Sequence, residues 1–329
     1  MGLIVSGIIG LTSSLLFSYV LYWLDRYEKE PILLLGGVFI WGAVVAAGSA
    51  FIINTVVGLG LYLFTNSSVA TDLTTGSLIA PLVEEILKGL AVLGVFLFFR
   101  REFDSILDGI IYAGVTALGF AATENVYYIY TFGFQEAGWS GLISLVFVRV
   151  ILVGWQHPFY TAFTGIGLAI ARLNKNWLIK ILAPLTGLSV ASFLHALHNT
   201  LATLLDGLAG MTIGAAVDWT GWLFMFGIVL WATWVERRHL KKYLSGELQV
   251  GTITPALYRT ATSAWLQMLA RMSAIFTGKY NKTARFYQVC GEYAHKRWQY
   301  DRLGDESGNL VIIQKLRQEM AQLTPNVQA

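Results

Sequence analysis

The stretch that decides the fold is Pro81-Leu82-Val83-Glu84-Glu85-Ile86-Leu87-Lys88-Gly89-Leu90, which lies inside an apolar run over residues 78–99. A run of this length can cross a bilayer as an α-helix. A charged side chain at membrane depth is costly, and it is kept mainly where it has a function, a partner or a water-filled cavity. Three charged side chains within five residues therefore mark this helix as the centre of a functional site in a membrane protein.

The composition is that of a polytopic membrane protein. Of the 329 residues, 55% are hydrophobic and only 13% are charged, whereas a soluble domain has about 25% charged residues. We expect an all-α bundle of about seven transmembrane helices over residues 1–235, followed by a small helical tail over residues 236–329. The single cysteine, Cys290, excludes an intramolecular disulfide and a cysteine-rich metal site.

Apolar runs place the expected spans at residues 3–24, 32–61, 78–99, 106–130, 150–171, 178–205 and 219–235. Residues 138–149 either extend the fifth span or lie in the membrane interface. In the tail, helices are expected over residues 255–276, 282–303 and 310–323.

Charges in the connections between spans predict the orientation. Lys and Arg follow the first, third, fifth and seventh spans, whereas the intervening loops over residues 65–77, 131–138 and 206–218 contain none. Because positively charged loops stay in the cytoplasm, we expect a multi-pass protein of the cell membrane with its N-terminus outside and its tail in the cytoplasm. The tail carries 14 Lys and Arg against 7 Asp and Glu, which is typical of a segment near anionic lipid and does not indicate a nucleic-acid partner.

Four of the expected spans carry polar side chains at helical spacing. The groups are Glu84, Glu85 and Lys88 on the third span, Glu124, Asn125 and Tyr128 on the fourth, His157 and Thr161 on the fifth, and His195, His198 and Asn199 on the sixth. Residues four apart lie on one face of a helix. The simplest arrangement turns the four polar faces toward a common interior, at a similar depth in the outer half of the membrane.

Two hydrolytic chemistries fit these residue types. A glutamate beside histidines can take a proton from water as the water attacks a carbonyl, while a histidine and an asparagine donate to the developing oxyanion. Alternatively, carboxylate and imidazole groups can hold a zinc ion, which lowers the pKa of a bound water. The residues alone leave both open.

The same residues, taken in order, resemble the motifs of the PrsW family of intramembrane proteases. They are Glu84-Glu85-x-x-Lys88, Gly119-Phe120-x-x-x-Glu124-Asn125-x-x-Tyr128, His157-x-x-x-Thr161 and His195-x-x-x-Asn199, over about residues 78–205. In outline this family is similar to the CAAX-prenyl endopeptidases, whose second motif is Phe-x-x-x-His. This chain has Glu124 in the place of that histidine, so the prenyl-protease mechanism does not transfer as a whole.

The resemblance implies an intramembrane endopeptidase that cuts a membrane-anchored protein near the outer face of the membrane. It implies that Glu84 and Glu85 are the main catalytic residues, that Glu124, His157 and His195 hold water or a metal, and that Asn199 assists. Lys88 would keep a glutamate ionised, and Asn125, Tyr128, Thr161 and His198 would support the site. Zinc held by His157, His195, Glu84 and Glu124 is the implied cofactor, with a metal-free glutamate mechanism as the alternative.

A second function class is an ion or solute transporter that uses the same intramembrane Glu, His and Lys side chains. The sequence gives it less support, because we find no repeat between the two halves of the chain. The polar groups are also expected at one depth and not along a track.

Overall fold

The computed structural model describes residues 1–205, 207–305 and 308–327, and these residues form helices and connecting turns without a β-strand. The chain divides into two compact units. Unit 1 comprises Met1–Trp23, Pro31–Arg172 and Asn176–Gly227, and unit 2 comprises Leu24–Glu30, Leu173–Lys175 and Ile228–Ala329. The all-α fold expected from the sequence is confirmed.

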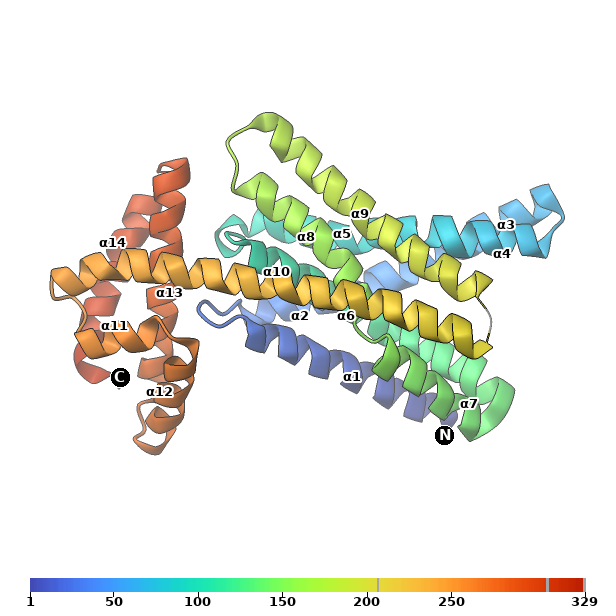
Figure 1. Cartoon of the computed structure of the whole chain (residues 1–329), viewed down its shortest axis with the longest axis horizontal. Helices are drawn as coiled ribbons and strands as arrows, with labels where there is room; N and C mark the ends of the chain where they lie inside the picture. The colour runs from blue at the N-terminus through green and yellow to red at the C-terminus, as the bar shows by residue number, and fades with distance from the viewer. Residues whose placement is uncertain (206, 306–307, 328–329) are drawn as a thin grey trace. The chain divides into compact units, whose positions relative to one another are not determined.

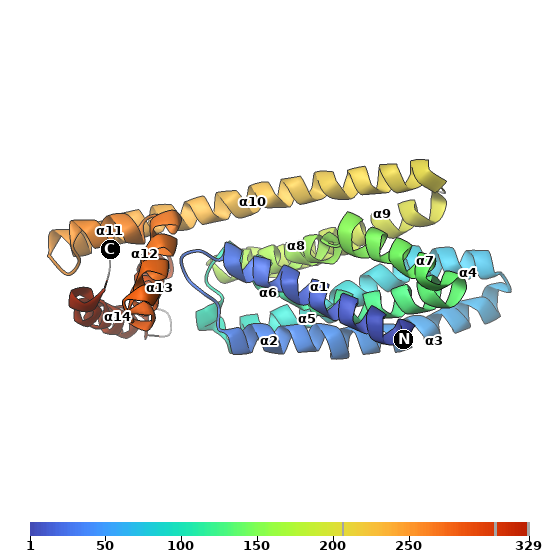
Figure 2. The same ribbon diagram turned by 90° about the horizontal axis from the view of Figure 1, so that it is seen from below.

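Unit 1 is a bundle whose longer helices run roughly side by side (Figures 1 and 2). Its helices are α1 (Gly2–Leu24), α2 (Ile32–Ile40), α3 (Ala47–Thr65), α4 (Ser68–Thr74), α5 (Ala80–Phe98), α6 (Ile106–Tyr128), α7 (Gln135–Val146), α8 (Gln156–Arg172), α9 (Trp177–Leu204) and the first part of α10 (Gly207–Gln249). Short π-helical turns join α2 to α3, α4 to α5 and α6 to α7, and another follows α7.

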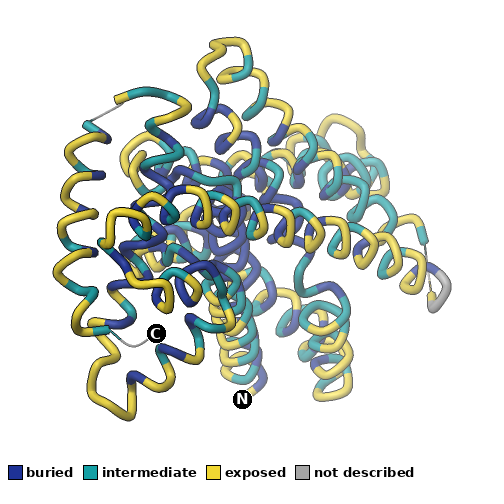
Figure 3. Tube along the Cα trace, turned by 60° about the vertical axis from the view of Figure 1, so that its left-hand side comes forward, coloured by how far each residue is buried: buried dark blue, intermediate teal, exposed yellow. Residues whose placement is uncertain are grey.

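Five helical stretches within the described residues are long and apolar enough to cross a membrane: Gly2–Leu24, Ile32–Thr65, Ile106–Arg172, Trp177–Leu204 and Gly210–Gln249. The third stretch has 67 residues, more than one passage needs, and it contains α6, α7 and α8. The chain is thus a multi-pass membrane protein, and the total of seven spans stays a prediction. Many large apolar side chains of these helices are exposed. In Figure 3 exposed residues lie mainly on the outer faces of the helices and buried residues toward the inside.

Helix α6 is the centre of unit 1, because its residues are buried without a break from Leu107 to Ala122. Close helix packing requires glycine on this helix. A Cβ atom on Gly109 would stand 2.4 Å from the carbonyl oxygen of Gly165 on α8, and a Cβ atom on Gly165 would stand 2.0 Å from that of Gly109. The helix begins at a capping box, in which Ser105 Oγ accepts from the Asp108 amide and Asp108 Oδ2 accepts from the Ser105 amide. These features fix the positions of the helices that carry the polar residues.

The fifth span starts later than expected. The sequence predicted this span from residue 150, but α8 begins at Gln156. Pro158 lies in the first turn of α8, where proline is tolerated because that amide needs no helical partner. Residues 138–149 belong mainly to a separate helix, α7, with a break at Ala137 and Gly138, where Gly138 has a φ of +59°.

All three expected loops without Lys or Arg are largely helical. Residues 131–138 lie in the π-helical turn Ile129–Phe134 and at the start of α7. Residues 68–74 form α4, and the long helix α10 already begins at Gly207, so the expected loop at 206–218 is wrong over its described part, residues 207–218. The stretch lacks proline, and Asp218, which the expected loop included, is buried and paired inside the bundle. Residue 206 lies outside the described residues.

Unit 2 is a small helical domain built on the second part of α10. Its further helices are α11 (Pro255–Ala261), α12 (Ala264–Phe276), α13 (Tyr280–Leu303) and α14 (Asn309–Leu323). The expected helix at 255–276 is split, because Ser263 caps a new helix by accepting from the Leu266 amide. The connection between α1 and α2 belongs to this domain: Tyr27 is part of its apolar core, and the Gln288 side chain bonds both the amide and the carbonyl of Lys29.

Candidate active site

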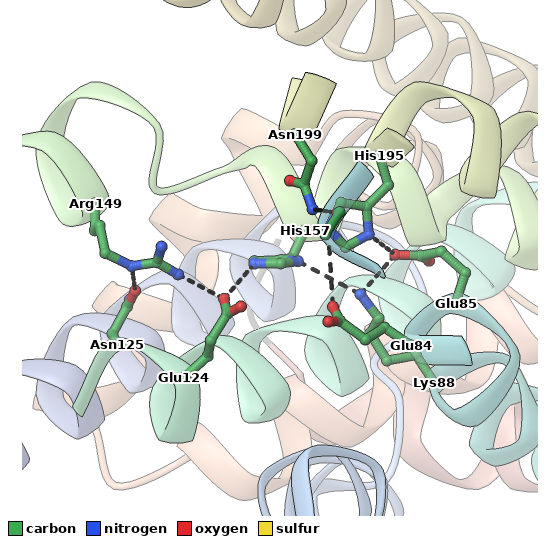
Figure 4. Close-up of polar contacts among 10 residues, drawn as sticks. Glu84, Glu85, Lys88, Glu124, Asn125, Arg149, His157, His195 and Asn199 are labelled. Atoms are coloured by element: carbon green, nitrogen blue, oxygen red, sulfur yellow. Dashed lines mark hydrogen bonds and ion pairs between the residues drawn. The ribbon is translucent and has the colours of Figure 1, made fainter. Parts of the chain in front are cut away.

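Unit 1 contains a cavity of about 890 Å³ lined by residues of α3, α5, α6, α8 and α9. Of the residues singled out in the sequence, those that line it are Glu84, Glu124, Tyr128, His157, His195, His198 and Asn199. Glu85, Lys88 and Thr161 are fully buried and are not part of the lining. The four helices expected to turn their polar faces inward thus meet at one cavity (Figure 4).

Glu84 and two histidines form the centre of the cluster. One ligand atom from each of Glu84, His157 and His195 lies within 4.8 Å of the others. His195 Nε2 is 3.8 Å from Glu84 Oε2. Within the described residues this Glu84 oxygen is buried and accepts no hydrogen bond. A buried carboxylate oxygen without a donor is costly, so a water or a cation at this position would stabilise it.

Glu85 lies behind Glu84 and is held by three donors. Lys88 Nζ donates to Glu85 Oε1 at 2.5 Å, Thr161 Oγ1 donates to Oε2 at 2.8 Å, and His195 Nδ1 donates to Oε1 at 2.9 Å. The ion partner of Lys88 is therefore Glu85, three residues away, and not Glu84, four residues away. The bond from Nδ1 leaves the lone pair of His195 on Nε2, the nitrogen near Glu84.

Glu124 is held by the residues of two other helical segments. Arg149 donates to Glu124 Oε2 at 2.5 Å and to Asn125 Oδ1 at 2.9 Å, and its guanidinium lies 4.1 Å above the ring centre of Tyr128. His157 Nε2 donates to the same Glu124 oxygen at 2.8 Å. This bond leaves the lone pair of His157 on Nδ1, 3.4 Å from Lys88 Nζ.

Asn199 lies four residues after His195 on α9, and its amide bonds to another element. The amide of Asn199 donates to the Gly76 carbonyl at 2.9 Å and so ties α9 to the turn before α5. His198 lies 2.8 Å from Asp218 of α10, and Asp218 also accepts from the Tyr160 hydroxyl at 3.1 Å. The ring of Tyr160 stacks on His195, with centroids 5.1 Å apart.

The donor set fits a metal of the zinc type. Two imidazoles and one carboxylate are a common ligand set of catalytic zinc. Each histidine here also donates a hydrogen bond from its other ring nitrogen to a carboxylate, which fixes its tautomer. The carboxylates are Glu85 for His195 and Glu124 for His157. A cation on His157 Nδ1 would displace the hydrogen bond from Lys88, whose ammonium keeps Glu85 as its partner. The described residues could therefore hold a metal ion here.

A family model described as "PrsW family intramembrane metalloprotease" matches residues 30–246, which is more than half of the chain. The chain belongs to this family. Proteins named "Protease PrsW" match it in Geobacillus kaustophilus (strain HTA426), 27% identical over 69% of this chain and 86% of that protein, and in Bacillus subtilis (strain 168), 27% identical over 69% and 89%. One in Clostridioides difficile (strain 630) is 31% identical over 34% of this chain and 46% of that protein.

No solved structure matches the chain. The PrsW model ends at residue 246, so most of unit 2 lies outside the matched region. The family membership supports the reading of the chain as an intramembrane endopeptidase.

Sequence reasoning about this PrsW-family site missed two polar partners. Arg149 received no role from the sequence, and Asp218 was included in an expected loop. The signal for Arg149 was its position among apolar residues, where a guanidinium needs an acceptor. No local pattern connects Asp218 to Tyr160 and His198, since the contacts join residues far apart in the chain.

Proposed function

We propose that this chain hydrolyses a peptide bond in a membrane-anchored protein, near the outer face of the membrane, with Glu84 activating the attacking water. The observation that carries the proposal is at the cavity wall. Glu84 has one oxygen free of donors there, and it has a ligand atom within 4.8 Å of one from each of His157 and His195. A carboxylate with a free oxygen in a polar cavity can take the proton of a water molecule.

The other residues follow from their partners. Glu85 has no oxygen free for a water, because both accept hydrogen bonds from the protein. We assign to it the orientation of His195 and the balance of the Lys88 charge. Glu124, held by Arg149, orients His157 in the same way.

The remaining residues act on the substrate side or support the helices. The second N–H of the Asn199 amide is available to a developing oxyanion at the cavity wall. Asn125 and Tyr128 position Arg149, Thr161 positions Glu85, and His198 is held by Asp218.

Zinc is the cofactor that suits this site, with Glu84, His157 and His195 as its ligands; in that alternative Glu84 acts by holding the ion and not as the base. When bound, the ion lowers the pKa of a coordinated water toward neutrality. In that arrangement the protein's part is to fix the two imidazoles through Glu85 and Glu124. Without the ion, the free ring nitrogen of one of these histidines can accept a hydrogen bond from the water that Glu84 deprotonates.

The orientation proposed from the charges puts the N-terminus outside and unit 2 in the cytoplasm. In unit 2, the connection 24–30 packs with the tail, and residues 173–175 belong to the same compact unit. Both connections were assigned to the cytoplasmic side on charge alone, so their grouping with the tail supports this orientation.

The experiment compares fragments of membrane proteins in cells that express the wild type, Glu84→Gln or Glu136→Gln at matched levels. Glu136 is exposed and belongs to the same unit, so its variant controls for the loss of a charge. We expect one or a few single-span proteins to lose a cleavage in Glu84→Gln alone. Identical fragment patterns together with altered ion or solute uptake in Glu84→Gln would replace the protease proposal by the transporter.

A further inference from the structure

Helix α12 of unit 2 is amphipathic in an unusual sense, because its apolar face is the exposed one. Trp265, Leu269, Met272 and Phe276 are 64%, 42%, 52% and 88% exposed. Their spacing of four, three and four residues places them on one side of the helix. The face toward the core of unit 2 carries Gln267, Ala270 and Ala274 instead.

The sequence of α10 indicates where the membrane surface lies in unit 2. The apolar part of this helix ends at Trp234 and is followed by Glu236, Arg237 and Arg238. The Arg238 guanidinium lies 4.7 Å above the Trp234 ring, and Trp234 is exposed. Tryptophan beside arginine at the end of an apolar helix is typical of the boundary between hydrocarbon and headgroups.

Two contacts hold the start of α12 at this level. Arg237 Nε donates to the carbonyl of Thr262, two residues before α12, at 2.9 Å. The hydroxyl of Tyr27, which follows the end of α1 by three residues, forms a hydrogen bond with the backbone of Ala264. The first residue of α12 is thus connected to the residues that follow two membrane-spanning helices.

Charge favours the same surface. Residues 255–282 contain Arg259, Arg271, Lys279 and Lys282 and no Asp or Glu. Arg259, Lys279 and Lys282 are exposed. An exposed apolar helix face flanked by cations is suited to the interface of a membrane that contains anionic lipid.

We propose that α12 lies in the lipid interface on the tail's side of the membrane, with Trp265, Leu269, Met272 and Phe276 inserted among the acyl chains and the neighbouring cations at anionic headgroups. Unit 2 would then be held at the bilayer by α12 as well as by the ends of α1 and α10. The occupant of this face is anionic phospholipid. The test below distinguishes lipid on this face from protein on it.

The test uses the full chain in nanodiscs of phosphatidylcholine and phosphatidylglycerol, with an environment-sensitive fluorophore attached at Leu269→Cys. The matched control is Gln318→Cys, an exposed polar site in the same unit. The neighbour of Gln318, Arg317, pairs with Glu247 of α10 at 2.8 Å. Glu247 lies ten residues beyond Arg237 on α10, which is about 15 Å further along the helix from the proposed interface. Gln318 therefore lies well away from the lipid. Cys290 is fully buried and does not compete for the label.

We expect a nitroxide on the lipid chains to quench the Leu269→Cys label several-fold more than the Gln318→Cys label, and iodide in the buffer to do the reverse. Replacing Lys279 and Lys282 by glutamine should reduce the lipid quenching in these anionic nanodiscs. Equal iodide quenching at both sites would overturn the proposal, since the face would then be in water. Protection of the Leu269→Cys label from both quenchers would also overturn it, since protein would then cover the face.

Discussion

At the scale of single residues, Glu84 and Glu85 carry the same carboxylate in opposite surroundings. Adjacent residues of a helix point about 100° apart, so that Glu84 reaches the cavity while Glu85 is enclosed with Lys88 and Thr161. In the proposed function, the site therefore separates a reacting carboxylate, Glu84, from a structural one, Glu85, within one helical turn.

This separation predicts different consequences for stability. Glu85→Gln leaves the buried ammonium of Lys88 without its ion partner and should lower the free energy of unfolding by about 3–5 kcal/mol. Glu84 Oε2 accepts no hydrogen bond within the described residues, so in metal-free protein Glu84→Gln should unfold near the wild-type temperature. Thermal unfolding of the two purified variants in the same detergent measures the difference, and equal loss in both would contradict these assignments.

Metal binding gives a second residue-scale prediction. Purified wild type should bind about one zinc ion per chain, and His157→Ala and His195→Ala should each lose it while remaining folded. Elemental analysis after dialysis measures the zinc. If the folded wild type contains no zinc and still cleaves its substrate, the zinc prediction is wrong and the metal-free glutamate mechanism applies.

Asp218 lies outside the motifs expected from the sequence, but its substitution should affect both stability and cleavage. Asp218→Ala removes the partner of both the Tyr160 hydroxyl and His198, and leaving such groups unpaired should cost about 1–3 kcal/mol. Because Tyr160 stacks on His195, the cleavage rate should fall as well, and Asp218→Asn, which still accepts from Tyr160, should restore part of both. If unfolding and cleavage are the same in Asp218→Ala as in the wild type, this network has no role.

At the scale of helices, glycines set the distance between α6 and α8. Gly165→Ala would place a methyl group against the Gly109 carbonyl, and the shift of the backbones should cost about 1–3 kcal/mol. Gly36→Ala is the control, because nothing lies within 4 Å of a Cβ atom there. Its stability should be unchanged or slightly higher, and a larger loss for Gly36→Ala than for Gly165→Ala in thermal unfolding would contradict the packing.

Sequence periodicity was sufficient to predict the bounds of helices that are simple apolar runs. It was insufficient where contacts between residues far apart in the chain determine a helix start or the partner of a polar residue. The expected runs at 3–24, 106–130 and 178–205 agree with α1, α6 and α9 within about two residues. The span expected from residue 219 left Asp218 in the preceding loop, but α10 begins at Gly207. Asp218 is buried in contact with Tyr160 of α8 and His198 of α9. Likewise, the spacing of four between Glu84 and Lys88 suggested a pair, but Glu85 also has Thr161 and His195 beside it.

At the scale of the whole molecule, the orientation can be tested with introduced cysteines. Cys290 itself is a poor probe, since burial raises the pKa of its thiol and no part of it is exposed. Ser68→Cys at the start of α4 should react with a membrane-impermeant maleimide on intact cells or spheroplasts. Gln318→Cys in unit 2 should react only after the cells are opened. The reverse pattern would invert the proposed topology.

The central claim is that Glu84 is the group that activates water for peptide hydrolysis. The most direct measurement is the rate at which purified wild type and Glu84→Gln, in the same lipid nanodiscs, cleave the membrane protein identified by fragment comparison. General-base catalysis contributes about 10²–10⁴-fold, so we predict a loss of this size in Glu84→Gln, with Glu136→Gln equal to the wild type. A Glu84→Gln protein that cleaves at the wild-type rate would contradict the account.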